Sequence, residues 1–226
     1  MRLLREYIRM LLTEAAMGPQ ELPDGVVVAF EQERDGVIIY FAHEAEPARA
    51  VLRFDGGKVA KLPYGLVEIN RFSSALGDCA GAWHVSRSLV KSGWGPMLYD
   101  IAIEYSTQHG GGLTSDRREV STEARAVWDY YLNSRGDVTA HQLDDDEASL
   151  KNKHAQGDPD GMLSYLGVDA GSLDVEDNCD QSVAMFRGAR SYPGDVEWAE
   201  SSLSKRYTKP PTTIDALRSA GRLVEL

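Results

Sequence analysis

The hydrophobic positions at the start of the chain follow the period of an α-helix. Within "RLLREYIRMLLTEAA" (residues 2–16), leucine, isoleucine and tyrosine recur at spacings of three and four, with arginines between them. Such spacing places the apolar side chains along one face of a helix. Gly18-Pro19 and Pro23-Asp24-Gly25 then interrupt the pattern. Residues 1–17 are therefore expected to form an amphipathic helix, separated by a short linker, that could serve as a removable leader.

From Gly25 onward the pattern becomes that of β-strands. The stretch "GVVVAFEQERDGVIIYFAH" predicts two strands around Arg34-Asp35-Gly36, because Asp-Gly between apolar runs is a hairpin signal. The stretch "ARAVLRFDGGKVAKLPYGLVEINRF" repeats this texture around Asp55-Gly56-Gly57. A meander of antiparallel strands is predicted, followed by a further strand over residues 81–90, "GAWHVSRSLV".

Two patterned helices are expected next, over about residues 96–109 and 121–133. Ser121 suits the N-cap of the second helix, with Glu123 in its first turn. Short strands are predicted at "GLTSDR" between the helices and at "DVTAHQL" after them. The apolar faces consist of Met97, Leu98, Ile101, Ala102 and Tyr105 in the first helix, and Ala124, Val127, Trp128, Tyr131 and Leu132 in the second.

Composition adds a strongly acidic C-terminal third to this picture. The chain has 226 residues, 42% of them hydrophobic, which is enough for a sizeable core. Its formal net charge is −11, and residues 141–200 hold 14 acidic and 4 basic side chains. Residues 143–226 are expected to be an acidic extension that ends in a helix, "TIDALRSAGRL". This balance argues against nucleic acid as the main partner, and its negative field favours a cationic amine.

Metal, disulfide and membrane signals are weak. Cys79 and Cys179 lie far apart, without the paired spacing of a zinc site or a disulfide framework. Asp144-Asp145-Asp146-Glu147 lacks the glycine and spacing of an EF-hand loop, so no metal is expected. No apolar run approaches the ~20 residues that span a bilayer. These features favour a soluble cytoplasmic protein without a membrane partner.

The stretch "KSGWGPMLYD" (91–100) carries the most specific chemistry. A strand that enters a glycine turn and then a helix presents unpaired backbone N–H groups and the positive end of the helix dipole to one point. Such a turn binds anions, phosphate above all. Gly93 and Gly95 remove side chains that would hold a diphosphate away, and Lys91 adds a positive charge. The spacing fits neither a P-loop nor the dinucleotide fingerprint, and a plain tight turn is the alternative.

The order of hairpins, strand, glycine turn, helix, strand, helix and strand over residues 25–142 resembles the GNAT family of N-acetyltransferases. Gly93 and Gly95 fill the small positions of the family motif Gln/Arg-x-x-Gly-x-Gly/Ala, and Val85 matches the apolar residue that ends the straight part of the strand. The family pattern Asn-x-x-Ala-x-x-x-Tyr falls on Ser121, Ala124 and Trp128. Three residues depart from these motifs: Val90 replaces Gln/Arg, Ser121 replaces Asn and Trp128 replaces Tyr.

The resemblance implies an α/β (α+β) fold with a mostly antiparallel mixed sheet, and acyl transfer from acetyl-CoA to a small-molecule or protein amine. It implies that Val85 contacts the pantetheine arm and that the glycine turn binds the diphosphate. The implied cofactor-binding residues are Val85, Lys91, Ser92, Gly93, Trp94, Gly95, Pro96, Ser121 and Ala124.

Acyl transfer needs a base for the amine and an acid for the departing thiolate. Tyr131, on the same helical face as Trp128, is the first candidate acid, His84 the first candidate base and Glu68 the second. The ordinary alternatives are a core tyrosine, a strand histidine bonded to backbone and a solvated glutamate. Asp116 and Arg117 are expected either to orient a polar substrate or to form a structural ion pair.

A second function class comes from the N-terminal helix. Leu12-Thr13-Glu14 before Ala15 resembles the Ile/Leu-x-Glu site cut by the prohead proteases of large tailed phages. This resemblance implies a non-catalytic head-interior protein with a phage capsid as partner, in the virion interior or the host cytoplasm, built on the same fold. The simpler alternative is a helix that packs on the domain or forms a homodimer through its apolar stripe.

Overall fold

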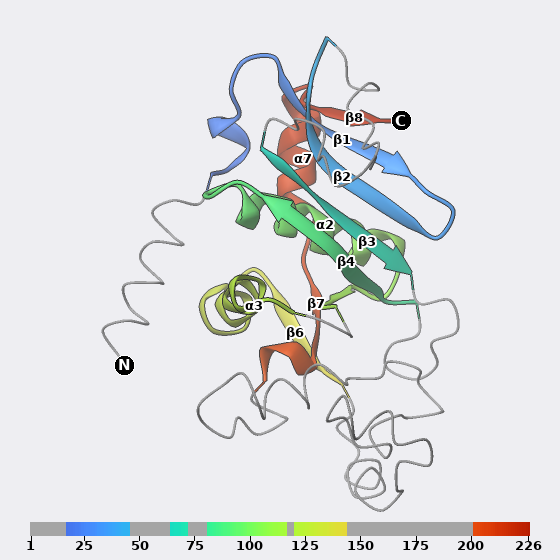
Figure 1. Ribbon diagram of the computed structural model, residues 1–226, viewed down its shortest axis with the longest axis vertical. Helices are drawn as coiled ribbons and strands as arrows, with labels where there is room; N and C mark the ends of the chain where they lie inside the picture. Colours follow the sequence, from blue (N-terminus) through green and yellow to red (C-terminus); the bar gives the residue numbers. More distant parts are fainter. Residues whose placement is uncertain (1–16, 46–63, 72–80, 117–119, 144–200) are drawn as a thin grey trace, which may run out of the picture. The chain divides into compact units, whose positions relative to one another are not determined.

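The computed structural model describes residues 17–45, 64–71, 81–116, 120–143 and 201–226 (Figure 1). These residues form three α-helices and a mixed eight-stranded sheet, so the predicted α+β class is confirmed. The strand order is β6-β7-β5-β4-β3-β2-β1-β8. The described chain divides into two compact units: residues 17–45, 64–70, 85–108 and 210–226 belong to the first, and residues 71, 81–84, 109–116, 120–143 and 201–209 to the second.

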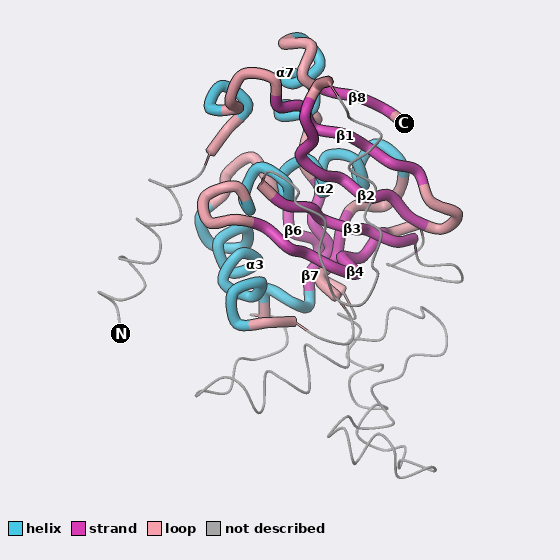
Figure 2. The backbone as a smooth tube through the Cα atoms, turned by 45° about the horizontal axis from the view of Figure 1, so that its top comes forward, coloured by secondary structure: helices cyan, strands magenta, loops and turns pink. Residues whose placement is uncertain are grey.

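The first unit contains an antiparallel meander whose strands are visible in Figure 2. The β1–β2 register runs from Val26↔His43 to Gln32↔Val37, which confirms the hairpin predicted around Asp35-Gly36. The β3 strand pairs antiparallel with β2, and β8 pairs parallel with β1. The strands of this unit are β1 (Val26–Gln32), β2 (Gly36–His43), β3 (Gly65–Arg71), β4 (Trp83–Val90) and β8 (Leu223–Glu225). Two of them belong to it only in part, β3 up to residue 70 and β4 from residue 85 onward.

Helix α2 (Gly95–His109) belongs to the first unit up to residue 108 and passes behind β3 and β4 in Figure 1. Its Tyr105 stacks on Phe30 of β1, with ring centroids 5.4 Å apart. Helix α2 is buried on nearly every side, because its buried residues include the predicted apolar face together with Tyr99, Ile103, Glu104 and Ser106. A helix that is buried all round is fixed by its packing rather than by its surface pattern.

The carboxylate of Glu104 ties α2 to helix α7 (Thr212–Ser219). Glu104 is fully buried and accepts hydrogen bonds from the N–H groups of Thr213 (2.9 Å) and Ile214 (2.7 Å). These are among the N–H groups that a helix cannot satisfy internally. The N-cap residue of α7 is Pro211, whose side chain makes no capping hydrogen bond. Glu104 therefore caps α7 from a different helix.

The second unit surrounds a cluster of aromatic rings. Trp128 stacks on Tyr207 with ring centroids 5.1 Å apart, and Tyr131 packs 6.3 Å from Trp128. The start of β4 pairs parallel with β5 at Trp83↔Leu113 and His84↔Thr114, whereas β7 pairs antiparallel with both β5 and β6. The remaining elements are β5 (Leu113–Thr114), α3 (Thr122–Ser134), β6 (Thr139–Gln142), η6 (Ser202–Ser204) and β7 (Lys205–Thr208).

The chain after residue 200 is part of the sheet, contrary to the expectation of an extension that begins at residue 143. Strand β7 lies between β5 and β6, and β8 forms the edge beside β1. Residues 144–200 thus connect two adjacent antiparallel strands. The last helix ends at Ser219, earlier than predicted, because Gly221 adopts a φ of 67° and the chain turns into β8.

Several predicted features lie outside the described residues: the N-terminal helix, the hairpin at Asp55-Gly56-Gly57, Cys79, Cys179 and most of the acidic segment. Among the described residues, no helix is both long and apolar enough to cross a membrane.

Candidate functional site

The predicted glycine turn joins β4 to α2 and is organised by its backbone. Gly93 has a φ of 86°, a conformation that residues with a side chain rarely adopt. The Trp94 N–H donates to the Lys91 carbonyl (3.2 Å), and the Leu98 N–H donates to the Trp94 carbonyl (3.3 Å). The last bond makes Trp94 the residue that precedes the first helical turn. The helix predicted over 96–109 is therefore confirmed, and it begins at Gly95.

The N-terminal end of α2 has backbone donors that no other described residue satisfies. Within the described part of the chain, the N–H groups of Gly93, Gly95 and Met97 have no hydrogen-bond partner. Trp94 has no side-chain oxygen to cap them, and the first turn of α2 contains no acidic residue. The positive end of a buried helix is therefore left for an external acceptor.

Gly95 is a glycine that the fold does not require. A Cβ atom built at Gly95 meets nothing within 4 Å, and its φ is outside the positive range. By contrast, a Cβ atom at Gly65 would lie 2.3 Å from the Leu89 carbonyl oxygen. Among the described residues, no atom therefore occupies the position of a Gly95 side chain, and a ligand that approaches the backbone closely would need that space.

Lys91 is exposed and lies beside an aromatic cluster that the sequence did not reveal. The Lys91 Nζ atom is 5.3 Å from the ring centroid of Tyr64. The backbone N–H of Lys91 donates to the Tyr64 carbonyl (2.9 Å). The Tyr64 ring packs against Trp94, with centroids 4.6 Å apart. Among the described residues, no carboxylate pairs with Lys91. Tyr64 thus holds the ammonium group next to the turn, a role that only the β3–β4 packing shows.

The candidate bases occupy different environments. His84 is half-buried on β4 and is in register with Thr114 of β5. Glu68, on β3, forms an ion pair with Arg87 (2.7 Å), so its carboxylate already has a cationic partner. The side chain of Val85 is buried, with 5% exposed. His84 belongs to the second unit and Glu68 and Val85 to the first.

The candidate residues of α3 are largely structural in their contacts. Tyr131 and Trp128 are each 1% exposed and belong to the aromatic core of the second unit. The Ser121 Oγ accepts a hydrogen bond from the Ala124 N–H (3.1 Å), which confirms Ser121 as the N-cap. Asp116 is half-buried, whereas Arg117 lies outside the described residues, so the predicted Asp-Arg pair is not described.

Charged side chains of the second unit make contacts around β6, β7 and the end of α3. Hydrogen bonds from Arg135 lower the pKa of Asp137 to about 2, against a smaller opposing effect of burial. Burial lowers the pKa of Lys205, whose ammonium donates to the Gln142 side chain across the β6–β7 pair. The pKa of His141 is lowered by burial and then by Arg206. These contacts hold neighbouring strands together rather than converge on one point.

The described residues contain no group of three or more His, Cys, Asp or Glu side chains that could hold a metal ion. Comparison of the chain with protein-family models, with curated proteins and with solved structures gives no significant match.

Proposed function

We propose that this protein binds acetyl-CoA at the turn of residues 91–96 and transfers the acetyl group to an amine. The observation that carries the proposal is Gly95: among the described residues, nothing lies within 4 Å of a Cβ atom built there, and the N–H groups of Gly93, Gly95 and Met97 at the start of α2 have no partner. A diphosphate supplies the oxygen acceptors that such a turn can bind. Lys91, held over Tyr64, supplies a positive charge beside it.

The surrounding topology supports the same proposal. The turn follows the carboxyl end of β4, and α2 then crosses to β5, which is parallel to β4. A strand–helix–parallel strand unit with a glycine turn at its first crossing is a common setting for phosphate binding. The described order of β4, turn, α2, β5, α3 and β6 matches the strand, glycine turn, helix, strand, helix and strand of the sequence pattern that resembles the GNAT family, whereas only one strand of its second hairpin, β3, lies among the described residues.

In the proposed reaction, the neutral amine attacks the thioester carbonyl carbon and forms the new C–N bond. Collapse of the adduct breaks the C–S bond, the amine loses a proton to a base and the CoA sulfur leaves as a thiol after receiving one. His84 is preferred to Glu68 as the base, because the carboxylate of Glu68 is paired with Arg87. Tyr131 remains the proposed acid, and Asp116 and Arg117 remain the proposed acceptor contacts.

The first test is isothermal titration of the purified protein with acetyl-CoA and with CoA. Micromolar binding of both is expected, followed by release of free thiol when an accepted amine is added to the acetyl-CoA complex. If neither acetyl-CoA nor CoA binds, the proposal of a CoA cofactor is wrong, whichever amines are tested.

His84→Gln is expected to lower kcat about 10²-fold or more while the Kd for CoA stays within about twofold.

The Tyr64 ring provides a second, smaller test. Tyr64→Leu is expected to raise the Kd for CoA about two- to fivefold, because a cation–π contact at an exposed site contributes about 0.5–1 kcal/mol. Tyr64→Phe keeps the aromatic face and is the matched control, with a Kd near that of the wild type. Equal effects of the two substitutions on CoA titration would exclude a role of the ring in holding Lys91.

The alternative function is a non-catalytic phage head-interior protein. The observation that favours it is Trp128: it is buried and stacked on Tyr207, at the position where the resembled family has a tyrosine. The tyrosine hydroxyl that would protonate the thiolate in the resembled family is therefore absent at this position, where Trp128 is part of the core. CoA binding without turnover on any amine class would support this alternative, as would cleavage of the chain after Glu14 by a prohead protease.

A further inference from the structure

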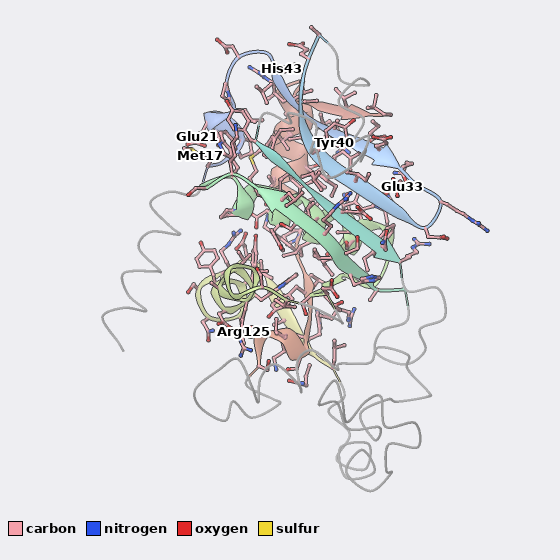
Figure 3. All side chains as sticks on the ribbon, in the orientation of Figure 1. Met17, Glu21, Glu33, Tyr40, His43 and Arg125 are labelled. Atoms are coloured by element: carbon pink, nitrogen blue, oxygen red, sulfur yellow. The ribbon has the colours of Figure 1, made fainter. Side chains whose placement is uncertain are left out.

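The chain segment before β1 is bonded to the proposed diphosphate turn. The Met17 N–H donates to the Gly93 carbonyl with an N···O distance of 2.9 Å. Figure 3 labels Met17 and Glu21, which lie together in the first unit. Seventy-six positions separate Met17 from Gly93, so this bond is a tertiary contact rather than part of the turn itself.

The accepted bond fixes the peptide group that the turn depends on. The Gly93 carbonyl and the Trp94 N–H belong to one planar peptide unit, so orienting one orients the other. That N–H closes the turn on the Lys91 carbonyl (3.2 Å). Gly93 has a φ of 86°, and because glycine has no Cβ atom its backbone bonds rotate more freely than those of other residues. Without a hydrogen-bond donor from outside, a glycine-rich turn would sample several conformations and lose them on binding, which costs affinity.

The donor side of this contact is itself held in place. The Gly18 N–H donates to the Glu21 Oε2 (2.7 Å), and the Glu21 N–H donates to the Gly18 carbonyl (3.1 Å). These two bonds close the short helix η1 (Pro19–Glu21), which contacts α7. Leu22, directly after it, is 7% exposed. Residues 17–22 are therefore anchored at both ends and can impose their geometry on the turn.

We infer that residues 17–22 form a positioning strap that pre-organises the turn for the diphosphate of CoA. This inference rests on the proposed function, because it assigns the strap to the same turn. The strap touches no ligand: it acts through the Gly93–Trp94 peptide. Its loss weakens binding of ligands that carry the diphosphate and leaves binding of pantetheine, which lacks the diphosphate, unchanged.

The test uses the full chain with Met17→Pro, which removes the N–H donor, and Met17→Ala, which keeps it. Titration with CoA is expected to give a Kd about three- to tenfold higher for Met17→Pro than for the wild type, as for loss of one hydrogen bond. Met17→Ala is expected to have the same Kd for CoA as the wild type. The Kd for pantetheine is expected to stay within about twofold in both variants.

Glu21→Ala provides a second variant on the exposed surface, in case Met17→Pro fails to fold. This substitution removes a negative charge close to an anion site, so electrostatics alone would tighten CoA binding. The strap predicts the opposite: Kd raised about two- to threefold, because the bond to Gly18 is lost. Glu33→Ala, at the exposed β1–β2 turn, is the matched control.

Two outcomes overturn the inference: CoA binding unchanged or tightened in the strap variants, or equal loss of CoA and pantetheine binding. Failure of the wild type to bind CoA would instead overturn the proposed function, so the two failures are distinguishable.

Discussion

Gly95→Asp is expected to raise the Kd for CoA at least about 100-fold, because like charges at about 4 Å repel by roughly 4 kcal/mol in an effective dielectric of about 20. The fold should tolerate the change, since a Cβ atom at Gly95 meets nothing within 4 Å. A carboxylate in the first turn of α2 also suits the helix dipole and its unsatisfied N–H groups. The melting temperature is therefore expected to stay the same or rise while binding is lost.

The matched control is Gly136→Asp, because Gly136 is also a glycine at which a Cβ atom meets nothing within 4 Å. It should keep the wild-type Kd for CoA by isothermal titration. Wild-type affinity in Gly95→Asp would place the diphosphate elsewhere and leave the open glycine without a role. A lowered melting temperature would show that the effect came through folding.

Glu104→Ala is expected to lower the free energy of unfolding by about 3 kcal/mol, because the Thr213 and Ile214 N–H groups would remain buried without an acceptor. For a chain of this length that corresponds to a melting temperature lower by about 6–12 °C. Glu104→Gln keeps one carbonyl acceptor and should lose about half as much. Urea unfolding followed by circular dichroism measures both.

Thr212→Ala is the control for local damage to α7, because the Thr212 hydroxyl is 3.3 Å from the Glu104 carboxylate, a longer contact. It is expected to change stability by less than about 1 kcal/mol. If Glu104→Ala were no more destabilising than Thr212→Ala, the cross-helix cap would contribute nothing, and α7 would be held by apolar packing of Ile214 and Leu217.

Local features were predictable from the sequence, and contacts between distant segments were not. The Asp35-Gly36 hairpin, the Gly93 turn and the Ser121 cap are each specified by a few neighbouring residues, and all three form as expected. Glu104, however, looks like an ordinary helix carboxylate until its contact with the first turn of α7, 109 positions later, is seen. Tyr64 likewise gains its role only from the packing of Lys91 and Trp94.

The place of β7 shows the same limit more strongly. Four residues, "KRYT", follow a long acidic stretch and carry no signal that they lie inside a sheet. These four residues form a strand because they pair with β5 and β6, and no local sequence pattern predicts that pairing. Tyr131 and Trp128 were placed correctly on one helical face, yet that periodicity could not say whether the face meets a ligand or a core.

The late position of β7 in the chain has a consequence for synthesis. Strand β6 leaves the ribosome long before β7, and bringing the two strands together costs about 3 kcal/mol more than closing a tight hairpin, since each doubling of loop length costs about 0.6 kcal/mol. Until residues 201–226 emerge, β5 lacks its neighbour β7, β1 lacks β8, and the buried Glu104 lacks the helix that it caps. Both units therefore complete their folding only after residues 201–226 have been translated, with open strand edges exposed to chaperones until then.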